Sequence, residues 1–346
     1  MRSPGITASI AASIMASITA SIMASVALCG TPGVASARPH TADPAELDDR
    51  DFWRDLIEPH GAAVASILTR AKRALGRAEA VPPDADGAVD RRHHLLDDAY
   101  GMLRYARTLS PDNPEVLRLL GTTADELGKT RQALDALEHC ARLDGPDRAG
   151  AEVTGRLGLI YLRLGKLDDA VRWLGYAQGP IIVGDHASHA VHLATALAAR
   201  GQMPAAIDLL INALPAQINY FTEPLTAVSF ALAVSYDRDD QPGAAFEVLD
   251  RMQTTLQQEM APLALTTLTA LPFAPAEDRY YYLAMLYEAI GDDIEARAEW
   301  ALYAAVTDAP WRRRALDHIQ AIDAQRRSRP AIHAAPAAPA GPHPVP

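Results

Sequence analysis

Residues 157–177 read LGLIYLRLGKLDDAVRWLGYA, and the spacing of small and large residues within this stretch decides the fold. After the opening leucine–glycine pair, the key positions follow at intervals of three, four, five, four and three residues: Tyr161, Gly165, Ala170, Leu174 and Ala177. Apolar residues three and four apart share one face of an α-helix, and the central glycine is typical of a helix end. The stretch therefore predicts two short antiparallel helices joined by a tight turn.

The same spacing occurs four more times along the chain. The small residue that follows the first leucine is, in chain order, Gly121, Gly158, Ala194, Ala233 and Ala284. We expect this residue to let the two helices of a unit approach closely. A later alanine, Ala170 in the quoted unit, is expected where the helices cross, since a larger side chain would force them apart. Five units in one register predict stacked hairpins that bury their apolar faces against one another.

This pattern resembles that of the tetratricopeptide repeat over about residues 90 to 305. The leading tryptophan of that repeat is absent here, and its place is taken by Leu117, Thr154, Ala190 and Tyr280. The resemblance implies an all-α fold, a right-handed α-solenoid of helix hairpins closed by capping helices. Composition agrees with helices, because hydrophobic residues make up 49% of the chain and aromatic residues, which favour sheets, only 6%.

The N-terminal region carries the features of an export signal. No charged residue lies between Arg2 and Arg38, and the apolar stretch ends in Val-Ala-Ser-Ala, with small residues at Ala35 and Ala37. We predict a signal peptide over residues 1–37, cleavage after Ala37, and a periplasmic or secreted protein. Two alternatives stay open: a leader retained as a membrane anchor, which its length allows, and a lipid on Cys29.

The remaining chain divides into four predicted segments. Residues 38–50 form an acidic flexible segment, residues 51–89 an N-terminal capping helix and loop, residues 90–325 the repeat array with a C-terminal capping helix, and residues 326–346 a disordered tail rich in alanine and proline. The step from Ala233 to Ala284 spans 51 residues, against about 34 for a standard unit. We therefore place an insertion at residues 254–278 and expect it to add a short helix and a loop.

The two capping helices have apolar stripes of their own. The first is expected over about residues 52–80, with an interruption near Pro59 and Gly61. The last is expected over residues 311–324, with its packed stripe formed by Trp311, Leu316, Ile319 and Ile322.

Charge and motifs exclude several classes of function. The formal net charge is −11 and no run of basic residues is present, which disfavours nucleic acid as a partner. The sequence contains no phosphate-binding glycine loop, no nucleophile elbow and no zinc-protease motif. Cys140 stands where we expect a small buried residue. We therefore expect no catalysis, no cofactor, no metal and no small-molecule substrate.

One group of residues leaves a metal-binding alternative open. His186, His189 and His192 follow one another at steps of three, so a helix would place them on one face. In the competing interpretation, His186 precedes the helix, His189 is solvated and His192 faces the groove.

In the repeat family, the first helix of each unit lines a concave surface that binds partners. Mapping that face onto this sequence gives a predicted groove formed by Arg118, Thr122, Arg156, Leu159, Leu162, Arg163, Val191, His192, Thr195, Phe230, Val234, Tyr281 and Met285. The lysine and asparagine that clamp a peptide carboxylate in some family members are missing. An apolar strip bordered by arginines suits an apolar or amphipathic segment of another protein. The alternative is that neighbouring segments of the chain fill the strip.

These features together predict a non-catalytic scaffold or adaptor of the bacterial cell envelope that binds a protein or peptide. A membrane is a partner only if the leader is retained. Two other hypotheses remain: a structural assembly factor that acts by oligomerising, and a metal-binding or hydrolytic enzyme.

Overall fold

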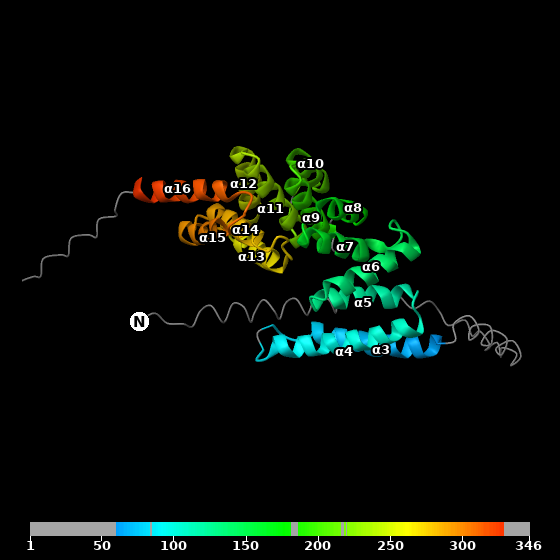
Figure 1. The fold of residues 1–346 in the computed structure, drawn as a ribbon. Coiled ribbons are helices and arrows are strands. Elements are labelled where there is room, and N and C mark those ends of the chain that lie inside the picture. Colours follow the sequence, from blue (N-terminus) through cyan, green and yellow to red (C-terminus); the bar gives the residue numbers. More distant parts are fainter. Residues whose placement is uncertain (1–59, 84, 181–185, 216–217, 219, 329–346) are drawn as a thin grey trace, which may run out of the picture. The chain divides into compact units, whose positions relative to one another are not determined.

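The computed structural model describes residues 60–328 apart from residues 84, 181–185, 216–217 and 219. The predicted signal peptide, the predicted acidic segment, the first part of the predicted N-terminal cap up to residue 59, and residues 329–346 of the predicted tail lie outside the described residues. The described part is helical, and no strand occurs in it (Figure 1). Its elements are α3 (Gly61–Glu79), α4 (Ala88–Leu109), α5 (Pro114–Glu126), α6 (Thr130–Asp144), α7 (Gly150–Arg163), α8 (Leu167–Tyr176), α9 (His186–Ala199), α10 (Met203–Ala213), α11 (Glu223–Arg238), α12 (Pro242–Leu256), η2 (Gln257–Glu259), α13 (Met260–Ala270), α14 (Asp278–Ala289), α15 (Asp293–Ala305) and α16 (Arg312–Ser328).

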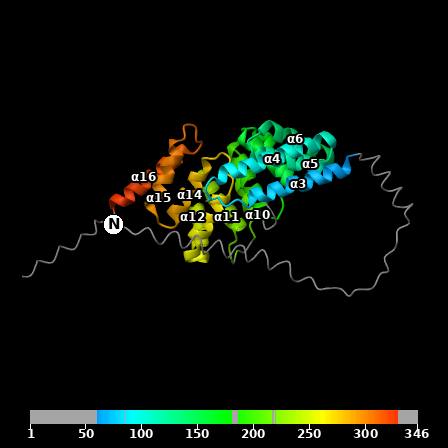
Figure 2. The same cartoon turned by 90° about the horizontal axis from the view of Figure 1, so that it is seen from below.

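The helices form hairpins that pack against their neighbours in chain order. The five predicted units are the pairs α5–α6, α7–α8, α9–α10, α11–α12 and α14–α15, and a further pair, α3–α4, precedes them. Figure 2, seen from below, shows α3 alongside α4 and α14 beside α15. The all-α solenoid of tetratricopeptide-like hairpins is thereby confirmed. No described helix is both long enough and apolar enough to cross a membrane.

Close contacts within each hairpin depend on the small residues of the repeat. A Cβ atom on Gly158 would lie 2.4 Å from Cγ of Leu174, and one on Gly121 would lie 2.4 Å from Cγ of Leu137. Ala170 is fully buried at the helix crossing, as are its counterparts Ala133, Ala206 and Ala296. The predicted role of the small positions is confirmed.

Replacing Gly158 with alanine is therefore expected to destabilise the protein by about 1–3 kcal/mol, the usual cost of overpacking. The new methyl group would also lie 2.9 Å from the backbone nitrogen of Leu174, which cannot move without shifting α8. Gly175→Ala is the matched control, because a Cβ there has nothing within 4 Å and alanine favours the helix. Urea unfolding followed by circular dichroism measures both. Equal midpoints for the two variants would contradict this account of the packing.

The turn between the helices of each unit has a left-handed residue. Gly165 has φ +68°, and glycines occupy the same place in three other units. In the α11–α12 unit the residue is Asp240, with φ 54°, one of the few non-glycine types that tolerate this conformation. Asp240 therefore closes its hairpin as glycine does elsewhere.

The C-terminal capping helix differs from its prediction. It extends to Ser328, past the expected end at residue 324, and Leu316 is 42% exposed instead of packed. The buried side of α16 instead carries Ala315 and Ile322, with His318 between them. The prediction was wrong about Leu316 because it counted apolar residues only, whereas a histidine occupies the packed face.

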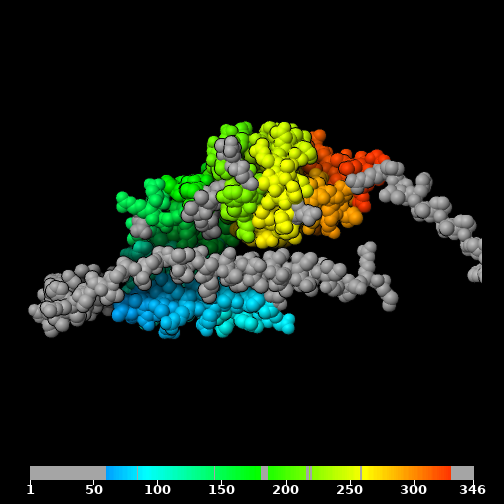
Figure 3. Space-filling view, turned by 180° about the vertical axis from the view of Figure 1, so that it is seen from behind, coloured from blue at the N-terminus to red at the C-terminus, as the bar shows by residue number. Residues whose placement is uncertain are grey.

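The insertion folds onto the array. It includes the end of α12, the short helix η2, helix α13 and a loop that leads to α14. Helix α13 packs against α11 and buries Met260, Ala264 and Leu268. In the space-filling view (Figure 3), α12 and α13 (yellow) form a continuous surface between the preceding helices (green) and α14–α15 (orange).

Two clusters of buried apolar residues form the core of the described array. One extends from α3 to α9 and also includes Ala274 of the insertion loop, and the other extends from α9 to α16. Helix α9 belongs to both, since Leu193 and Ala196 lie in the first cluster and Val191 and Ala194 in the second.

Candidate protein-binding groove

A hollow of about 320 Å³ lies where the first helices of three units meet the end of the insertion. Its walls are largely apolar and come from α7, α9, α11, α13 and the loop after α13: Leu159, Ala187, Ala227, Ala270, Leu271 and Pro272. Polar side chains stand among them, including Glu152, Arg156 and Glu223. This hollow is hereafter the central groove. It contains three of the predicted groove residues, Arg156, Leu159 and His192.

A glycine brings α7 and α9 together in the wall of the central groove. A Cβ on Gly155 would lie 2.1 Å from Nε2 of His189, so only glycine leaves room for the imidazole. His189 is consequently buried, at 7% exposure, and the expectation that it is solvated was wrong. His186 is the first residue of α9 and not a residue before the helix.

His192 fixes the loop of the insertion to α9. Its Nε2–H donates to the carbonyl oxygen of Pro272, and its Nδ1 accepts from the hydroxyl of Ser188 at 3.3 Å. The proton belongs on Nε2 because a carbonyl oxygen can only accept. Burial lowers the pKa of His192 from 6.5 to about 4, so the ring is neutral at physiological pH.

The three predicted arginines form ion pairs that link one unit to the next. Arg118 donates to Glu152 at 2.7 Å, while Arg156 and Arg163 both pair with Asp125, whose side chain is buried. Arg156 lines the central groove, whereas Arg118 and Arg163 are not among its lining residues. Three guanidinium groups share two carboxylates, since Arg156 and Arg163 pair with the same Asp125, so these ion pairs leave one positive charge uncompensated.

Most of the other predicted groove residues are buried within the chain. Phe230 and Tyr281 are fully buried, and exposure is below a tenth for Thr122, Leu162, Val191, Thr195, Val234 and Met285. These side chains do not form an accessible strip, contrary to the expectation. The physical reason near Phe230 is α13, which packs against α11. Near Tyr281, the side chains of Trp300, Tyr303 and Arg238 surround the ring.

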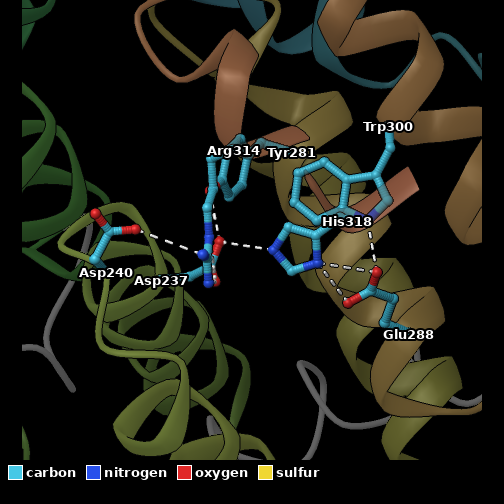
Figure 4. A network of polar contacts seen from close by, with 7 residues as sticks. All are labelled: Asp237, Asp240, Tyr281, Glu288, Trp300, Arg314 and His318. Carbon is cyan, nitrogen blue, oxygen red and sulfur yellow. Dashed lines mark hydrogen bonds and ion pairs between the residues drawn. The ribbon is translucent and has the colours of Figure 1, made fainter. Parts of the chain in front are cut away.

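A polar cluster that the sequence analysis missed joins α16 to α11 and α14 (Figure 4). At its centre lies the buried carboxylate of Asp237, which accepts from Tyr281 at 2.6 Å, from Arg314 at 2.6 Å and from His318 at 3.0 Å. The other imidazole nitrogen of His318 donates to Glu288 at 3.0 Å. The ring of His318 stacks on Trp300, whose indole N–H donates to Glu288 at 2.9 Å. We name these residues the α16 cluster.

Electrostatics in the α16 cluster favour the charged forms. Burial alone would lower the pKa of His318, but hydrogen bonds to Asp237 and Glu288 raise it to about 9. Burial would likewise raise the pKa of Asp237, but His318 and Arg314 hold it well below its usual range. His318 is therefore protonated at neutral pH and bridges two carboxylates.

A second buried charge pair lies beside this cluster. Arg238 pairs with Asp278 at 2.8 Å, and the two side chains are only 3% and 2% exposed. The guanidinium lies between the rings of Tyr281 and Trp311, at 4.4 and 3.9 Å from their centroids. The pair joins the end of α11 to the start of α14.

Two observations concern the metal-binding alternative and Cys140. Within residues 60–328, as far as they are described, no group of three or more His, Cys, Asp or Glu side chains could hold a metal ion. Cys140 is buried, as expected, with its sulfur 3.5 Å from the carbonyl oxygen of Pro114.

No family model matches the sequence, and no curated protein matches it. Several solved structures are similar to the chain. PilW, a type IV pilus biogenesis factor, is 15% identical, with 73% of this chain and 97% of that chain covered and a TM-score of 0.43. PilF of Pseudomonas aeruginosa is 11% identical, with 77% and 99% covered and a TM-score of 0.46. A tetratricopeptide repeat protein from Parabacteroides merdae is 14% identical, with 81% and 98% covered and a TM-score of 0.41. The fold assignment rests on the helix pairs themselves.

Proposed function

We propose that this chain is a non-catalytic scaffold of the cell envelope that holds a short segment of another protein in its central groove. The observation that carries the proposal is the hollow of about 320 Å³ bounded by three first helices and the insertion. Concave sites with apolar walls and few polar groups are where proteins usually bind ligands. Export rests on the apolar leader and on the Ala35–Ala37 spacing.

The lining favours an apolar or amphipathic segment. Arg156 and Glu152 are already committed to ion pairs within the chain, and His192 is neutral. Leu159 is half-buried and presents an aliphatic surface between the helices. A leucine-sized side chain of the partner would thus meet aliphatic walls, with its flanking backbone near the polar rim.

Site-specific photocrosslinking tests the proposal in the mature protein. We expect p-benzoylphenylalanine placed at Leu159 to form an adduct with a distinct protein when the chain is irradiated in an envelope extract of the source organism. The same amino acid placed at Ile211, an exposed residue of α10 away from the groove, is expected to give no such adduct. A peptide map of the adduct then identifies the segment that binds.

A substitution that places a charge in the central groove provides a second test. Leu159→Glu is expected to lower capture by about tenfold or more, because a carboxylate would be desolvated against apolar walls. Ile211→Glu is the matched control and should leave capture unchanged, with circular dichroism showing that both variants fold. Equal adducts at the two positions would refute the proposal. An adduct of twice the chain's own mass would instead indicate assembly of copies of this chain.

A further inference from the structure

A second hollow, of about 310 Å³, lies between α12, α14 and α16 and has no part in the central groove. Its apolar side is formed by Phe246, Leu249 and Met285, and its polar side includes Asp250, Glu288 and His318. We name it the acidic hollow. The α16 cluster forms one of its walls, since Asp237, Glu288 and His318 belong to both (Figure 4).

The charges that line the acidic hollow do not balance. Its carboxylates are those of Asp237, Glu288 and Asp250, and no lysine or arginine lines it. The one cationic group in the lining, His318, is already shared between Asp237 and Glu288. Asp250 is exposed and has no hydrogen-bond or ion-pair partner among the described residues. Arg314, which lies outside the lining, also pairs with Asp237, so the negative charge that the chain itself leaves uncompensated is that of Asp250.

An exposed aromatic ring stands at the same hollow. Phe246 is 67% exposed although it is a large apolar residue. It is four residues before Asp250 on α12, so the two side chains are neighbours on one helix face. A cation placed there could lie over the ring and beside the carboxylate together, two attractions that reinforce each other.

We propose that the acidic hollow binds an arginine side chain of a partner protein. The aliphatic stem packs on Leu249 and Met285, and the guanidinium lies between the ring of Phe246 and the carboxylate of Asp250. Arginine fits better than lysine because its planar, weakly hydrated head stacks on rings and pairs with a carboxylate through two donors. We choose a protein as the occupant because the hollow has an apolar side as well as a charged one. A small cation would leave the apolar side in contact with water, whereas an arginine stem and the residues next to it would cover it. The scaffold thus has a docking point separate from the central groove.

A pair of peptides tests this with the full mature chain. The probes are acetyl-Gly-Leu-Arg-Leu-Gly-amide and the same peptide with citrulline, the neutral isostere, in place of arginine. The readout is the NMR signal of ¹³C-labelled methionine methyl groups, because Met285 lines the hollow whereas Met252 is fully buried and does not. We expect the arginine peptide to shift the Met285 signal and to bind about tenfold more tightly than the citrulline peptide.

Variants of the hollow complete the experiment. Asp250→Asn and Phe246→Ala are each expected to lower the affinity of the chain for the arginine peptide by about fivefold or more. Asp208→Asn, an exposed change on α10, should have no effect. Leu159→Glu should also leave the Met285 response intact, so failure here and failure of the central groove are distinguishable. An unshifted Met285 signal at millimolar peptide, equal binding of the citrulline peptide, or full affinity in Asp250→Asn would each overturn the proposal.

Discussion

Replacing Arg238 with methionine is expected to lower the free energy of unfolding by about 3–5 kcal/mol. The variant leaves the carboxylate of Asp278 buried without its partner, and a buried unpaired charge is far more costly than a missing attraction. Methionine keeps most of the volume between the rings of Tyr281 and Trp311, so a packing defect contributes little. Urea unfolding followed by tryptophan fluorescence measures the loss, since Trp311 lies against Arg238.

Two controls separate the charge effect from general damage. The double variant Arg238→Met with Asp278→Leu should recover most of the stability, because apolar residues often replace a buried ion pair at no cost. Arg172→Met breaks the exposed pair with Asp169 and should cost about 1 kcal/mol at most. A double variant as unstable as the single one would show that the charge pair is not what holds this region.

The stability of the C-terminal region is expected to fall as the pH rises from 6.5 to above 9. His318 has a pKa of about 9 in the folded chain and 6.5 when unfolded. Because the pKa of His318 is raised in the folded chain, its protonated ring contributes its full stabilisation below pH 6.5. That contribution to the free energy of unfolding is lost as the pH rises through 9. The difference corresponds to about 3 kcal/mol, which we expect as the change in free energy of unfolding measured by urea titration at pH 6 to 10.

His318→Gln provides the comparison for this effect. Glutamine can still donate a hydrogen bond to a carboxylate but does not titrate, so the slope assigned to His318 should vanish. Asp237 has the opposite sign: its pKa is lowered in the fold, so its contribution is present above pH 3.8 and is lost in strong acid. A slope between pH 6.5 and 9 that persists in the glutamine variant would show that another group carries it.

The fold was predictable because its signals are local and repeated. Gly158, Ala170 and Gly165 stand at fixed spacing, and each is required by a contact or a backbone angle within a single hairpin. Five copies of the same requirement make the prediction independent of any one residue. Even the exception, Asp240, belongs to the small set of residues that accept positive φ.

The site was predictable only in part because it depends on contacts between distant segments. Sequence spacing placed Leu159 and Phe230 on equivalent helices, but it could not show that α13 would pack beside the second and not the first. The α16 cluster is a similar case. His318 reads as an interruption of an apolar stripe, and its partner Asp237 is 81 residues earlier in the chain. Helical periodicity describes only nearby residues, so it does not predict an ion pair between residues that are far apart in the sequence.

Helix α9 sets a limit on how this chain can be shortened. Its neighbouring residues Leu193 and Ala194 belong to different core clusters. A fragment that ends at α8 or begins at α10 lacks α9, and the apolar residues that α9 covers in the remaining cluster become exposed to water. Either half of the array needs its own copy of α9 to stay water-soluble when expressed alone. Ala274 of the insertion loop also belongs to the first cluster, so a fragment that ends at α9 leaves that cluster without this residue as well.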